Sequence, residues 1–400
     1  MRSECVGIIN LDNKNDLTMN QLTNVRPIAS LPIAGRYRVI DFSLSNMVNS
    51  GITNVGIFAK EKYRSLTDHL GSGKDWDLSR KTGGLFIFSP ENTKDRSKYP
   101  YRNGDIYNIL ANIDYIERCE EEYILIAPSY MIGNIDYTEM IDYHKESDND
   151  ITILYKSIDN ADVDFYETST LNIDGNRVIN MGTNIGTSKN ANVSMETYIM
   201  KRTDFIKTIY KCVSEGTHSY IEDFIAESIN KLKIGAYEYK GYLKCINSIK
   251  SYYSMKDELL QEDIANELLY SDRKILTKEQ NQSPTIYSDS AKVENSFVAT
   301  GCVIEGTVKN SIIFRKVHIK EGAVIENSVI MQNCTIEKDA QLQNVIFDKN
   351  VYISEGKELK GDINMQEENW TTIIKPKTGW FDINLKELIQ YKDLIVMFVK

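Results

Sequence analysis

The chain has 400 residues, of which 42% are hydrophobic and 26% charged, and its formal net charge is −10. This composition is typical of a globular protein of two or three domains, and the acidic charge disfavours binding to nucleic acid. The six cysteines form no CxxC pair, so the sequence predicts neither a zinc site nor a disulfide framework. Since there is no secretory leader and no apolar run of ~18 residues, we expect a cytoplasmic protein without a membrane span.

The first 255 residues alternate short apolar runs with amphipathic patterns. Strands separated by helices are typical of βαβ units, so the sequence predicts an α/β domain with a mostly parallel sheet. The clearest expected strands are Val55–Ala59, Tyr123–Ile126 and Ile151–Tyr155, and the clearest expected helices are Asp105–Arg118 and Ser219–Leu232.

A helix and a linker are expected at residues 256–288. The charged amphipathic stretch Ser254–Leu269 predicts the helix, and it leads into a polar link at Thr277–Pro284.

The pattern then changes to a repeat, which we assign to residues 289–362. Three segments align without gaps from Asn310, Asn327 and Asn344, and a related one begins at Asn295. Within each full segment an apolar residue recurs every six positions, which is typical of a parallel β-helix. Each coil needs neighbours to bury its core, so the stack stabilises itself. The recurring residues are Ile313, Ile319, Ile325, Ile330, Ile336, Leu342, Phe347, Ile353 and Leu359.

One motif near the N-terminus resembles a known family. RPIASLPIAGRYRVIDFSLSNMVNSGITNVGIF, from Arg26 to Phe58, resembles the N-terminal region of bacterial ADP-glucose pyrophosphorylases, the glucose-1-phosphate adenylyltransferases of glycogen synthesis. The stretch Lys62–Leu70 resembles the element that follows in the family, and Ser194, Met195 and Tyr198 fall where the family has S-M-G-I-Y. The resemblance covers about residues 1–362 and implies a Rossmann-like nucleotidyltransferase domain followed by a left-handed parallel β-helix of hexapeptide repeats.

The family joins ATP to glucose 1-phosphate and releases pyrophosphate. Backbone N–H groups of a glycine-rich loop hold the triphosphate, and basic side chains offset charge that develops on the phosphoryl oxygens. Carboxylates hold the Mg²⁺ that bridges the phosphates.

The glycine-rich loop is degenerate in this chain. The corresponding stretch Leu11–Thr23 reads LDNKNDLTMNQLT, and the family's glycines fall at Asn13, Lys14 and Asp16. The arginine of the loop falls at Thr18. Side chains on this turn obstruct close approach of the backbone to phosphate, so we expect no intact cofactor-binding loop.

Other catalytic positions are also replaced. The family's lysine after the loop falls at Ile28, and its two metal-binding aspartates fall at Tyr130 and Cys245. The lysine that holds the sugar phosphate falls near Asn184 in a looser alignment. Losing one such transition-state contact typically costs ~3 kcal/mol or more, so the resemblance implies a site that is impaired in catalysis and holds no metal or cofactor.

One alternative is an active sugar-phosphate nucleotidyltransferase with a divergent site. Asp12, Asp105 and Asp136 are its obvious reserve carboxylates, and only this alternative requires Mg²⁺. A helix N-terminal capping role is equally open for Asp105.

Some bacteria carry two paralogues of the enzyme, and this chain resembles the GlgD-type regulatory subunit, which modulates a catalytic partner. The resemblance therefore implies a heterotetramer with that partner. Arg26, Arg36 and Arg38 match the family's effector-anion region, where planar guanidinium groups suit a phosphorylated small-molecule effector. Arg64 and His69 are expected nearby. Local salt bridges are the alternative role for the three arginines.

Residues 363–400 depart from the family. They resemble the cytoplasmic N-terminal segment of polysaccharide-export ABC transporter permeases. The apolar run Leu394–Val399 is too short to span a bilayer. The origin of this tail stays open between a fusion, a gene-boundary artefact and a C-terminal extension.

Overall fold

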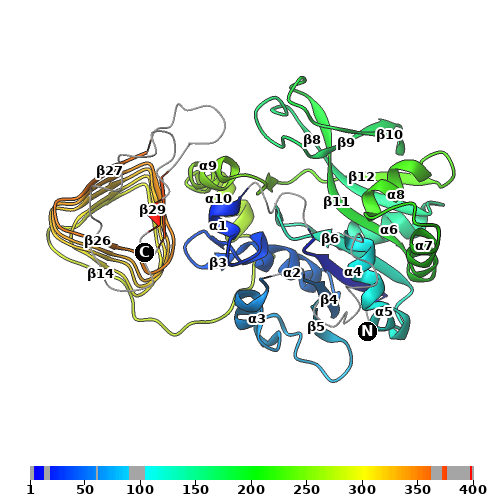
Figure 1. The fold of residues 1–400 in the computed structure, drawn as a ribbon, viewed down its shortest axis with the longest axis horizontal. Helices are drawn as coiled ribbons and strands as arrows, with labels where there is room; N and C mark the ends of the chain where they lie inside the picture. Colours follow the sequence, from blue (N-terminus) through cyan, green and yellow to red (C-terminus); the bar gives the residue numbers. More distant parts are fainter. Residues whose placement is uncertain are drawn as a thin grey trace.

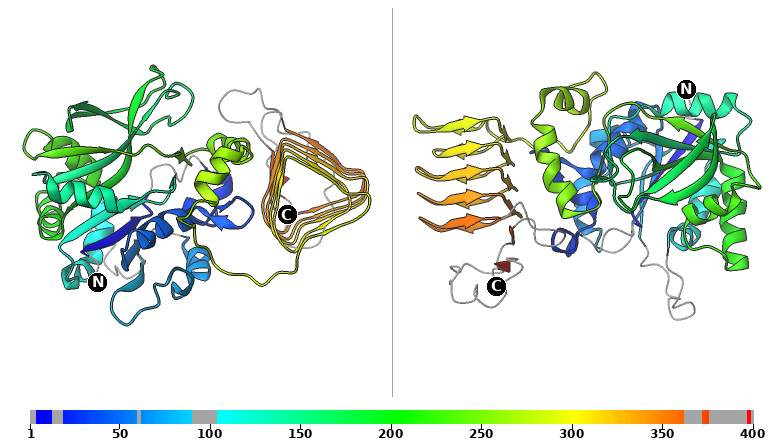
Figure 2. Two further views of the ribbon diagram at one scale, coloured as in Figure 1. Left: turned by 180° about the vertical axis from the view of Figure 1, so that it is seen from behind. Right: turned by 90° about the horizontal axis from the view of Figure 1, so that it is seen from above.

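The computed structural model describes residues 4–12, 19–59, 62–89 and 104–361, and the backbone of 372–375 and 397–398. Two bodies lie side by side along the long axis of the molecule (Figure 1). One is an α/β domain and the other is a stack of triangular coils, which Figure 2 shows from behind and from above. Among the described residues, no helix is both long and apolar enough to cross a membrane.

The α/β domain is built on a nine-stranded sheet with the order β5-β4-β1-β6-β11-β8-β12-β10-β9. Four strands at one side run parallel to one another, since β1 pairs with β4 and β6, and β4 pairs with β5. The strands are β1 (Cys5–Asn10), β4 (Asn54–Phe58), β5 (Gly84–Phe88), β6 (Tyr123–Pro128), β8 (Ile151–Ile158), β9 (Ser169–Asp174), β10 (Arg177–Thr183), β11 (Ala191–Lys201) and β12 (Ile234–Glu238).

The prediction of a mostly parallel sheet is wrong for half of this sheet. Strand β11 lies antiparallel between β6 and β8, and β10 pairs antiparallel with both β9 and β12. No helix intervenes between β9, β10 and β11, so hairpin-like connections replace the βαβ crossovers there. The three expected strands themselves are confirmed as β4, β6 and β8.

Helices cover both faces of this sheet (Figure 1). The expected helix Asp105–Arg118 is broken at Asn112, whose side chain donates to the carbonyl of Asn108 and thereby competes with the helical ladder. The expected helix Ser219–Leu232 is shorter than predicted. The helices are α1 (Asn20–Thr23), α2 (Val39–Asn49), α3 (Arg64–Leu70), α4 (Asp105–Ala111), α5 (Ile113–Arg118), α6 (Tyr137–Glu146), α7 (Arg202–Glu215) and α8 (Ile221–Ser228), with 3₁₀ turns η2 (Ile28–Ser30) and η3 (Lys74–Trp76).

Two further helices join the α/β domain to the coils. Helix α9 (Ile249–Leu259) begins five residues before the expected Ser254, because Ser248 caps it by accepting a hydrogen bond from the N–H of Ser251 (3.1 Å). Helix α10 (Glu262–Leu269) follows. The boundary expected between residues 255 and 256 therefore falls inside α9.

The coils form a parallel β-helix with three sheets, one on each side of the triangle (Figure 2). The first sheet holds β14 (Ile286–Tyr287), β17 (Val303–Ile304), β20 (His318–Ile319), β23 (Thr335–Ile336) and β26 (Tyr352–Ile353). The second holds β15 (Lys292–Glu294), β18 (Thr307–Lys309), β21 (Val324–Glu326), β24 (Gln341–Gln343) and β27 (Glu358–Lys360). The third holds β16 (Phe297–Val298), β19 (Ile312–Ile313), β22 (Val329–Ile330), β25 (Val345–Phe347), β28 (Thr372–Lys375) and β29 (Met397–Phe398).

The repeat pattern predicts the interior of the coils correctly. All nine apolar residues of the six-residue pattern lie in one core, eight of them buried and Leu359 partly buried. The asparagine that begins each aligned segment stands at a corner with positive φ, 47° at Asn310 and Asn327 and 56° at Asn344. Asparagine tolerates this left-handed conformation better than most residues, which explains its recurrence. Apart from the backbone of β28 and β29, the expected tail at 363–400 lies outside the described residues.

The third sheet faces the α/β domain and shares its core. Phe314, Val329 and Ile346 belong to the same buried cluster as the inner strands and helices of that domain. The hydroxyl of Tyr252 on α9 donates to the carbonyl of Pro32 (2.7 Å) and fixes the helix between the two bodies. A continuous apolar core therefore crosses the boundary between them. Short ribbons complete the domain: β2 (Pro32–Ile33) with β3 (Tyr37–Arg38), and β7 (Met131–Ile132) with β13 (Lys244–Cys245).

Candidate functional site

Tyr130 and Cys245, the two positions expected to have replaced metal aspartates, lie on one ribbon. Tyr130 stands in the turn between β6 and β7, and β13 pairs with β7 so that Cys245 is opposite Met131. The N–H of Ile246 donates to the carbonyl of Tyr130 (2.9 Å). The fold thus brings together two positions that are more than a hundred residues apart in the sequence.

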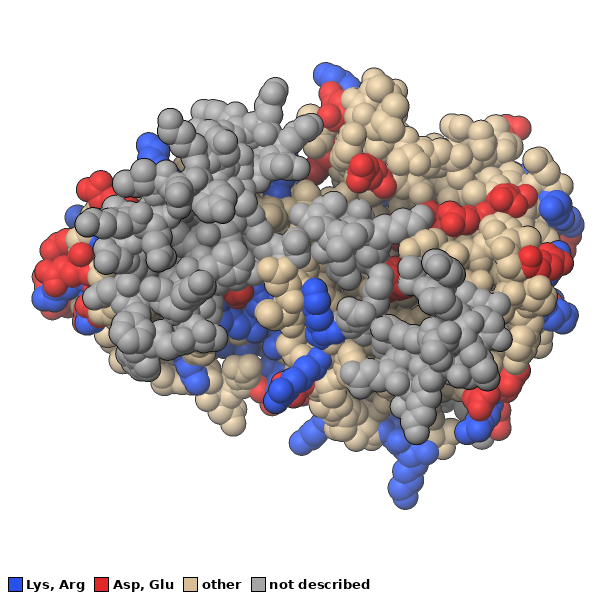
Figure 3. Space-filling model, in the orientation of Figure 1, with Lys and Arg blue, Asp and Glu red and all other residues tan. Residues whose placement is uncertain are grey.

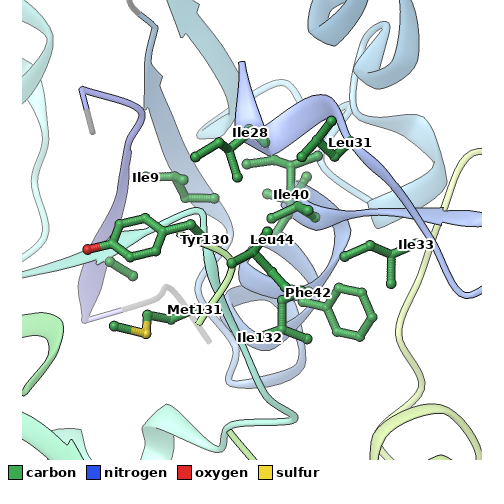
Figure 4. Packing of buried hydrophobic residues seen from close by; sticks show 14 of the residues in the cluster. Ile9, Ile28, Leu31, Ile33, Ile40, Phe42, Leu44, Tyr130, Met131 and Ile132 are labelled. Atoms are coloured by element: carbon green, nitrogen blue, oxygen red, sulfur yellow. The ribbon is translucent and has the colours of Figure 1, made fainter. Parts of the chain in front are cut away.

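Neither side chain is ionised near neutral pH. Tyr130 is 3% exposed and its hydroxyl donates to the carboxylate of Glu196. Burial, and then the charge of Glu196, raise the pKa of Tyr130 well above its ordinary value. Burial and the same carboxylate raise the pKa of the Cys245 thiol. Figure 4 shows the Tyr130 hydroxyl at the margin of an apolar cluster that also contains Ile28.

Glu196 is a site residue that the sequence analysis did not single out. It stands at an irregularity in the pairing of β11 with β8, between Ser194 and Thr197, and its φ is 48°. This backbone conformation favours glycine, and the resembling family has glycine at this position of S-M-G-I-Y. A glutamate at a glycine position of that motif was the signal that could have found it.

A cleft of about 340 Å³ opens beside Tyr130. Its described lining contains five carboxylates and neither lysine nor arginine. A phosphate group entering it would meet like charge from the lining. Among the described residues, no group of three or more histidine, cysteine or acidic side chains is placed to hold a metal ion. The five acidic residues are Asp12, Asp105, Glu167, Glu196 and Glu222.

Asp105 does cap a helix, but not its own. Gly104 is the N-cap of α4, whereas the Asp105 carboxylate accepts the first N–H of α8, from Ile221 (3.0 Å). It also accepts a hydrogen bond from the side chain of Asn10 (3.2 Å). Burial is the main cause that raises the pKa of Asp105 to about 7.

Three other positions singled out from the sequence, Ile28, Asn184 and Asp136, make contacts that stabilise the fold. Ile28 is 1% exposed and packs in the core where the family's lysine would stand. The amide of Asn184 donates to loop carbonyls, including that of Ala161 (2.8 Å). Asp136 caps α6 and forms an ion pair with Arg273 (2.8 Å), so it lies outside the cleft lining. The degenerate loop positions Asn13, Lys14, Asp16 and Thr18 lie outside the described residues.

The first arginine of the expected anion region, Arg26, lies at the boundary between the two bodies. It is 4% exposed and forms an ion pair with Asp348 of the β-helix (2.9 Å). Its Nε atom is buried and has no hydrogen-bond partner. Arg26 therefore joins the two bodies and leaves one donor unused.

The other two arginines lie near it. Arg38 begins α2 and donates to the carbonyl of Ser65 (2.6 Å), and Arg36 is exposed with its guanidinium 5.2 Å from the ring centroid of Tyr37. Burial lowers the pKa of Arg38, and the charge of Arg26 lowers it further.

Of the two residues expected nearby, His69 is buried and Arg64 is exposed. His69 lies 2.6 Å from a carboxylate oxygen of Asp41, which also accepts the N–H of Arg38. His69 is therefore connected to the arginines through Asp41.

The β-helix adds two cations that the sequence analysis missed. Burial and the charges of Arg38 and Arg26 lower the pKa of Lys349 to about 8, and burial and the charge of Arg36 lower that of Arg315. Figure 3 shows Lys and Arg side chains gathered where the two bodies meet. Arg315 and Lys349 are two coils apart at the same position of the seventeen-residue repeat, and this periodicity could have revealed them. We call Arg26, Arg36, Arg38, Arg315 and Lys349 the boundary cluster.

Comparisons with known proteins agree with this architecture. Residues 19–182 match the nucleotidyl transferase family, and residues 283–375 match the GlmU-like C-terminal hexapeptide family, in agreement with the predicted left-handed β-helix. The chain is 35% identical over 306 residues to the glycogen biosynthesis protein GlgD of Bacillus subtilis, which covers 76% of this chain and 78% of that protein.

Two further relatives are similar over comparable lengths. A glycogen biosynthesis protein GlgD of Geobacillus stearothermophilus is 36% identical over 326 residues, 81% of this chain and 84% of that protein. A glucose-1-phosphate adenylyltransferase of Mycoplasma mobile is 32% identical over 332 residues, 81% of this chain and 85% of that protein.

Proposed function

The chain belongs to the ADP-glucose pyrophosphorylase (glucose-1-phosphate adenylyltransferase) family and is GlgD-like, and from this premise we propose that it is a regulatory, catalytically impaired subunit. In this role it would contribute to glycogen biosynthesis by modulating a catalytic subunit that makes ADP-glucose and pyrophosphate from ATP and glucose 1-phosphate.

The observation that carries the proposal is the pair Tyr130 and Cys245. Mg²⁺ requires oxygen ligands, commonly one or two carboxylates together with substrate phosphates. A buried phenol and a buried thiol, both with raised pKa values, present no negative charge at these two positions. The metal that bridges the phosphates in this reaction would therefore lack its protein ligands here.

The charge of the cleft supports the same proposal. The described lining has five carboxylates and no cation, whereas phosphoryl transfer needs cations at the charge that develops in the transition state. Ile28, buried in the core, supplies no such charge.

The alternative of an active transferase gains one supporting observation, since Asp12 and Asp105 line the cleft together with Glu196. Asp136, the third reserve carboxylate, is held by Arg273 outside it. Burial that raises the pKa of Asp105 to about 7 also weakens it as an anionic ligand at neutral pH. We therefore favour the regulatory role.

An assay of ADP-glucose synthesis with and without a catalytic subunit separates the two roles. The full chain alone, with ATP, glucose 1-phosphate and Mg²⁺, should release no measurable pyrophosphate. Added to the catalytic subunit, it should change that subunit's kinetics and co-elute with it as a mixed tetramer. Turnover by the chain alone at about 1 s⁻¹ or faster, an ordinary enzyme rate, would refute the proposal.

We further assign the boundary cluster to a phosphorylated small-molecule effector. Arginine forks bind phosphate oxygens in pairs, and the unused Nε of Arg26 together with the lowered pKa of Lys349 indicates a site whose cations lack sufficient counter-charge. Pyrophosphate is the simplest probe. It should bind the full chain, and Arg36→Ala should weaken that binding, because Arg36 is exposed and its guanidinium forms no ion pair with any of the described residues. Equal binding of pyrophosphate by the unaltered chain and by Arg36→Ala would contradict the assignment.

A further inference from the structure

A second and larger cleft lies on the α/β domain, and the proposed function does not use it. Its volume is about 1040 Å³, at the upper end of the ~300–1,000 Å³ that is typical of ligand sites. The ends of β8 and β9 and the loops at 159–165 and 184–190 form one part of its lining, and α9 and α10 contribute to the other (Figure 1). It contains neither Tyr130 nor any residue of the boundary cluster, although Thr183 lines both this cleft and the one beside Tyr130, and the buried Asn184 belongs to its lining.

The cleft is rich in neutral hydrogen-bonding side chains. Ten of its 25 lining residues are asparagine, serine or threonine. Among the described residues, no protein group forms a hydrogen bond with five of these side chains, which leaves their donors and acceptors for solvent or a ligand. The five are Asn160, Asn172, Thr187, Ser188 and Asn190.

Most charges in the lining are already engaged within the protein. Lys156 donates to the carbonyl of Gly241 (2.6 Å). Asp164 and Glu258 both form ion pairs with the buried Lys244, at 2.9 and 2.5 Å. Glu267 accepts the backbone N–H of Tyr242.

The balance that remains is negative. The lining has four acidic residues and two lysines, and Lys244 pairs with two of the acidic residues, so one net negative charge remains. A phosphate-bearing ligand therefore gains no net attraction from these charges, and a neutral polar ligand needs none.

An exposed aromatic ring directly follows the lining residues Asp164 and Phe165 in the chain. Tyr166 is 55% exposed, and a Cβ atom built on Gly186 would lie 3.6 Å from its Cδ2 atom. Gly186 lies between Ile185 and Thr187, which both line the cleft. Asn247 donates to the carbonyl of Tyr166 (2.8 Å) and thereby holds this part of the loop.

We propose that this cleft binds a neutral carbohydrate chain, an oligosaccharide and not a sugar phosphate. A pyranose ring has an edge of hydroxyl groups and two faces of C–H groups. Planar amides and hydroxyls such as those of Asn172 and Asn190 satisfy the edge, because each amide offers both donors and an acceptor. The exposed ring of Tyr166 provides a flat apolar surface for a face. A cleft of about 1040 Å³ has room for several sugar units.

Titration calorimetry on the full chain tests the proposal. The probes are maltoheptaose and cellohexaose, which present the same hydroxyl chemistry on chains of different shape. At least one should bind with a Kd of about 1 mM or tighter, and the linkage that binds better identifies the shape the cleft accepts. If neither binds at concentrations up to about 10 mM, the proposal is wrong.

Two variants locate the binding. Tyr166→Ala and the double variant Asn172→Ala/Asn190→Ala should each weaken binding by about tenfold or more. Tyr270→Ala, which removes a ring that is 67% exposed outside the cleft, and Asn176→Ala on the β9–β10 turn are the matched controls and should leave binding unchanged. All five side chains are exposed, so unchanged unfolding midpoints will establish that each variant is folded. Binding that survives both cleft variants would overturn the assignment to this cleft.

Discussion

The cleft beside Tyr130 and the boundary cluster have opposite charge. Five carboxylates and no cation line the described part of the cleft, whereas five cations gather at the boundary with Asp41, Asp68 and Asp348 as their nearby acids. Both regions belong to one continuous core, so the difference lies in side chains and not in the fold. The sign of the charge at each place therefore depends on the side chains that the fold carries there, and one fold can present acidic residues at one place and basic residues at another.

Breaking the ion pair at the boundary should have the largest effect. Arg26→Met leaves Asp348 buried without its partner, so the free energy of unfolding should fall by about 3–5 kcal/mol. Urea unfolding followed by circular dichroism measures this loss.

The double variant Arg26→Met/Asp348→Leu removes both charges and should recover most of the stability. Arg36→Ala, at an exposed position, should change it by less than about 0.5 kcal/mol. A small effect of Arg26→Met alone would show that the boundary does not depend on this pair.

The pH dependence of stability should come in part from Asp105. The pKa of Asp105 is about 7 in the folded protein and ~3.9 in an unfolded chain, so the folded state binds the proton more tightly. Stability from this group is complete below pH ~4 and is lost as the pH rises toward 7, by about 4 kcal/mol in total.

Asp105→Asn should remove this fall, because the amide keeps an acceptor for the N–H of Ile221 without a charge. Unfolding free energies between pH ~4 and 7, the range in which the loss occurs, would test this. If the unfolding free energy changes equally steeply with pH in the unaltered protein and in Asp105→Asn, the pKa of Asp105 is not raised.

Restoring carboxylates beside Glu196 would make the cleft more like an active site. Tyr130→Asp/Cys245→Asp should lower stability without metal, because buried like charges repel. Mg²⁺ at about 100 times its Kd should then raise the unfolding free energy by about 2.7 kcal/mol.

The neutral variant Tyr130→Asn/Cys245→Asn controls for size and polarity and should show no response to Mg²⁺. Full activity should not return in the charged variant, because Ile28 and the loop at 13–18 remain unsuited to phosphate. An equal Mg²⁺ response in both variants would mean that these positions do not face a metal site.

The smallest effect is expected at Lys349. Burial and two arginines hold its pKa near 8, below its ordinary value, so its ammonium group is disfavoured in the folded protein at pH 7. The free-energy cost of the charged ammonium group in the folded protein is present below pH 8 and disappears as the pH rises toward 10. Lys349→Gln should therefore raise stability at pH 7 by about 1 kcal/mol, since the side chain is partly exposed and its charge is screened.

Lys349→Gln should also weaken pyrophosphate binding. The positive charge of Lys349 is unfavourable in the free protein, but it would attract a bound anion. Thermal unfolding and calorimetry measure the two effects. If Lys349→Gln is less stable than the unaltered protein and binds pyrophosphate equally well, Lys349 does not belong to the proposed anion site.

The sequence predicts the coils well because their rule is local. A six-residue apolar period places Ile319 or Ile336 inside without reference to distant residues, and the structure agrees. The break at Asn112 was missed because a side chain that bonds its own helix is not visible in an apolar period. The antiparallel entry of β11 was missed because strand direction depends on connections between distant segments.

In the candidate site, too, the sequence identifies some features and not others. A motif could identify Tyr130, Cys245 and Ile28 as replaced positions, since each stands at a fixed offset in the resembling family. It could not show that Tyr130 bonds Glu196 or that Arg26 is paired with Asp348, because these partners are distant in sequence. Contacts of this kind arise only when distant segments of the chain are packed together.

The regular spacing of the coils places equivalent side chains at fixed intervals along the axis of the β-helix. Neighbouring parallel strands lie ~4.8 Å apart, so each seventeen-residue coil advances a side chain by one fixed step along the axis. Arg315 and Lys349 are two such steps apart, and this height decides which of them meets Arg36 and which meets Arg26. A gene that gained or lost one whole coil would still encode a well-packed stack, yet the cations beyond the change would face different neighbours. The neighbours of these two cations at the boundary are therefore set by the number of coils, and insertion of a whole coil would change those neighbours without disturbing the core.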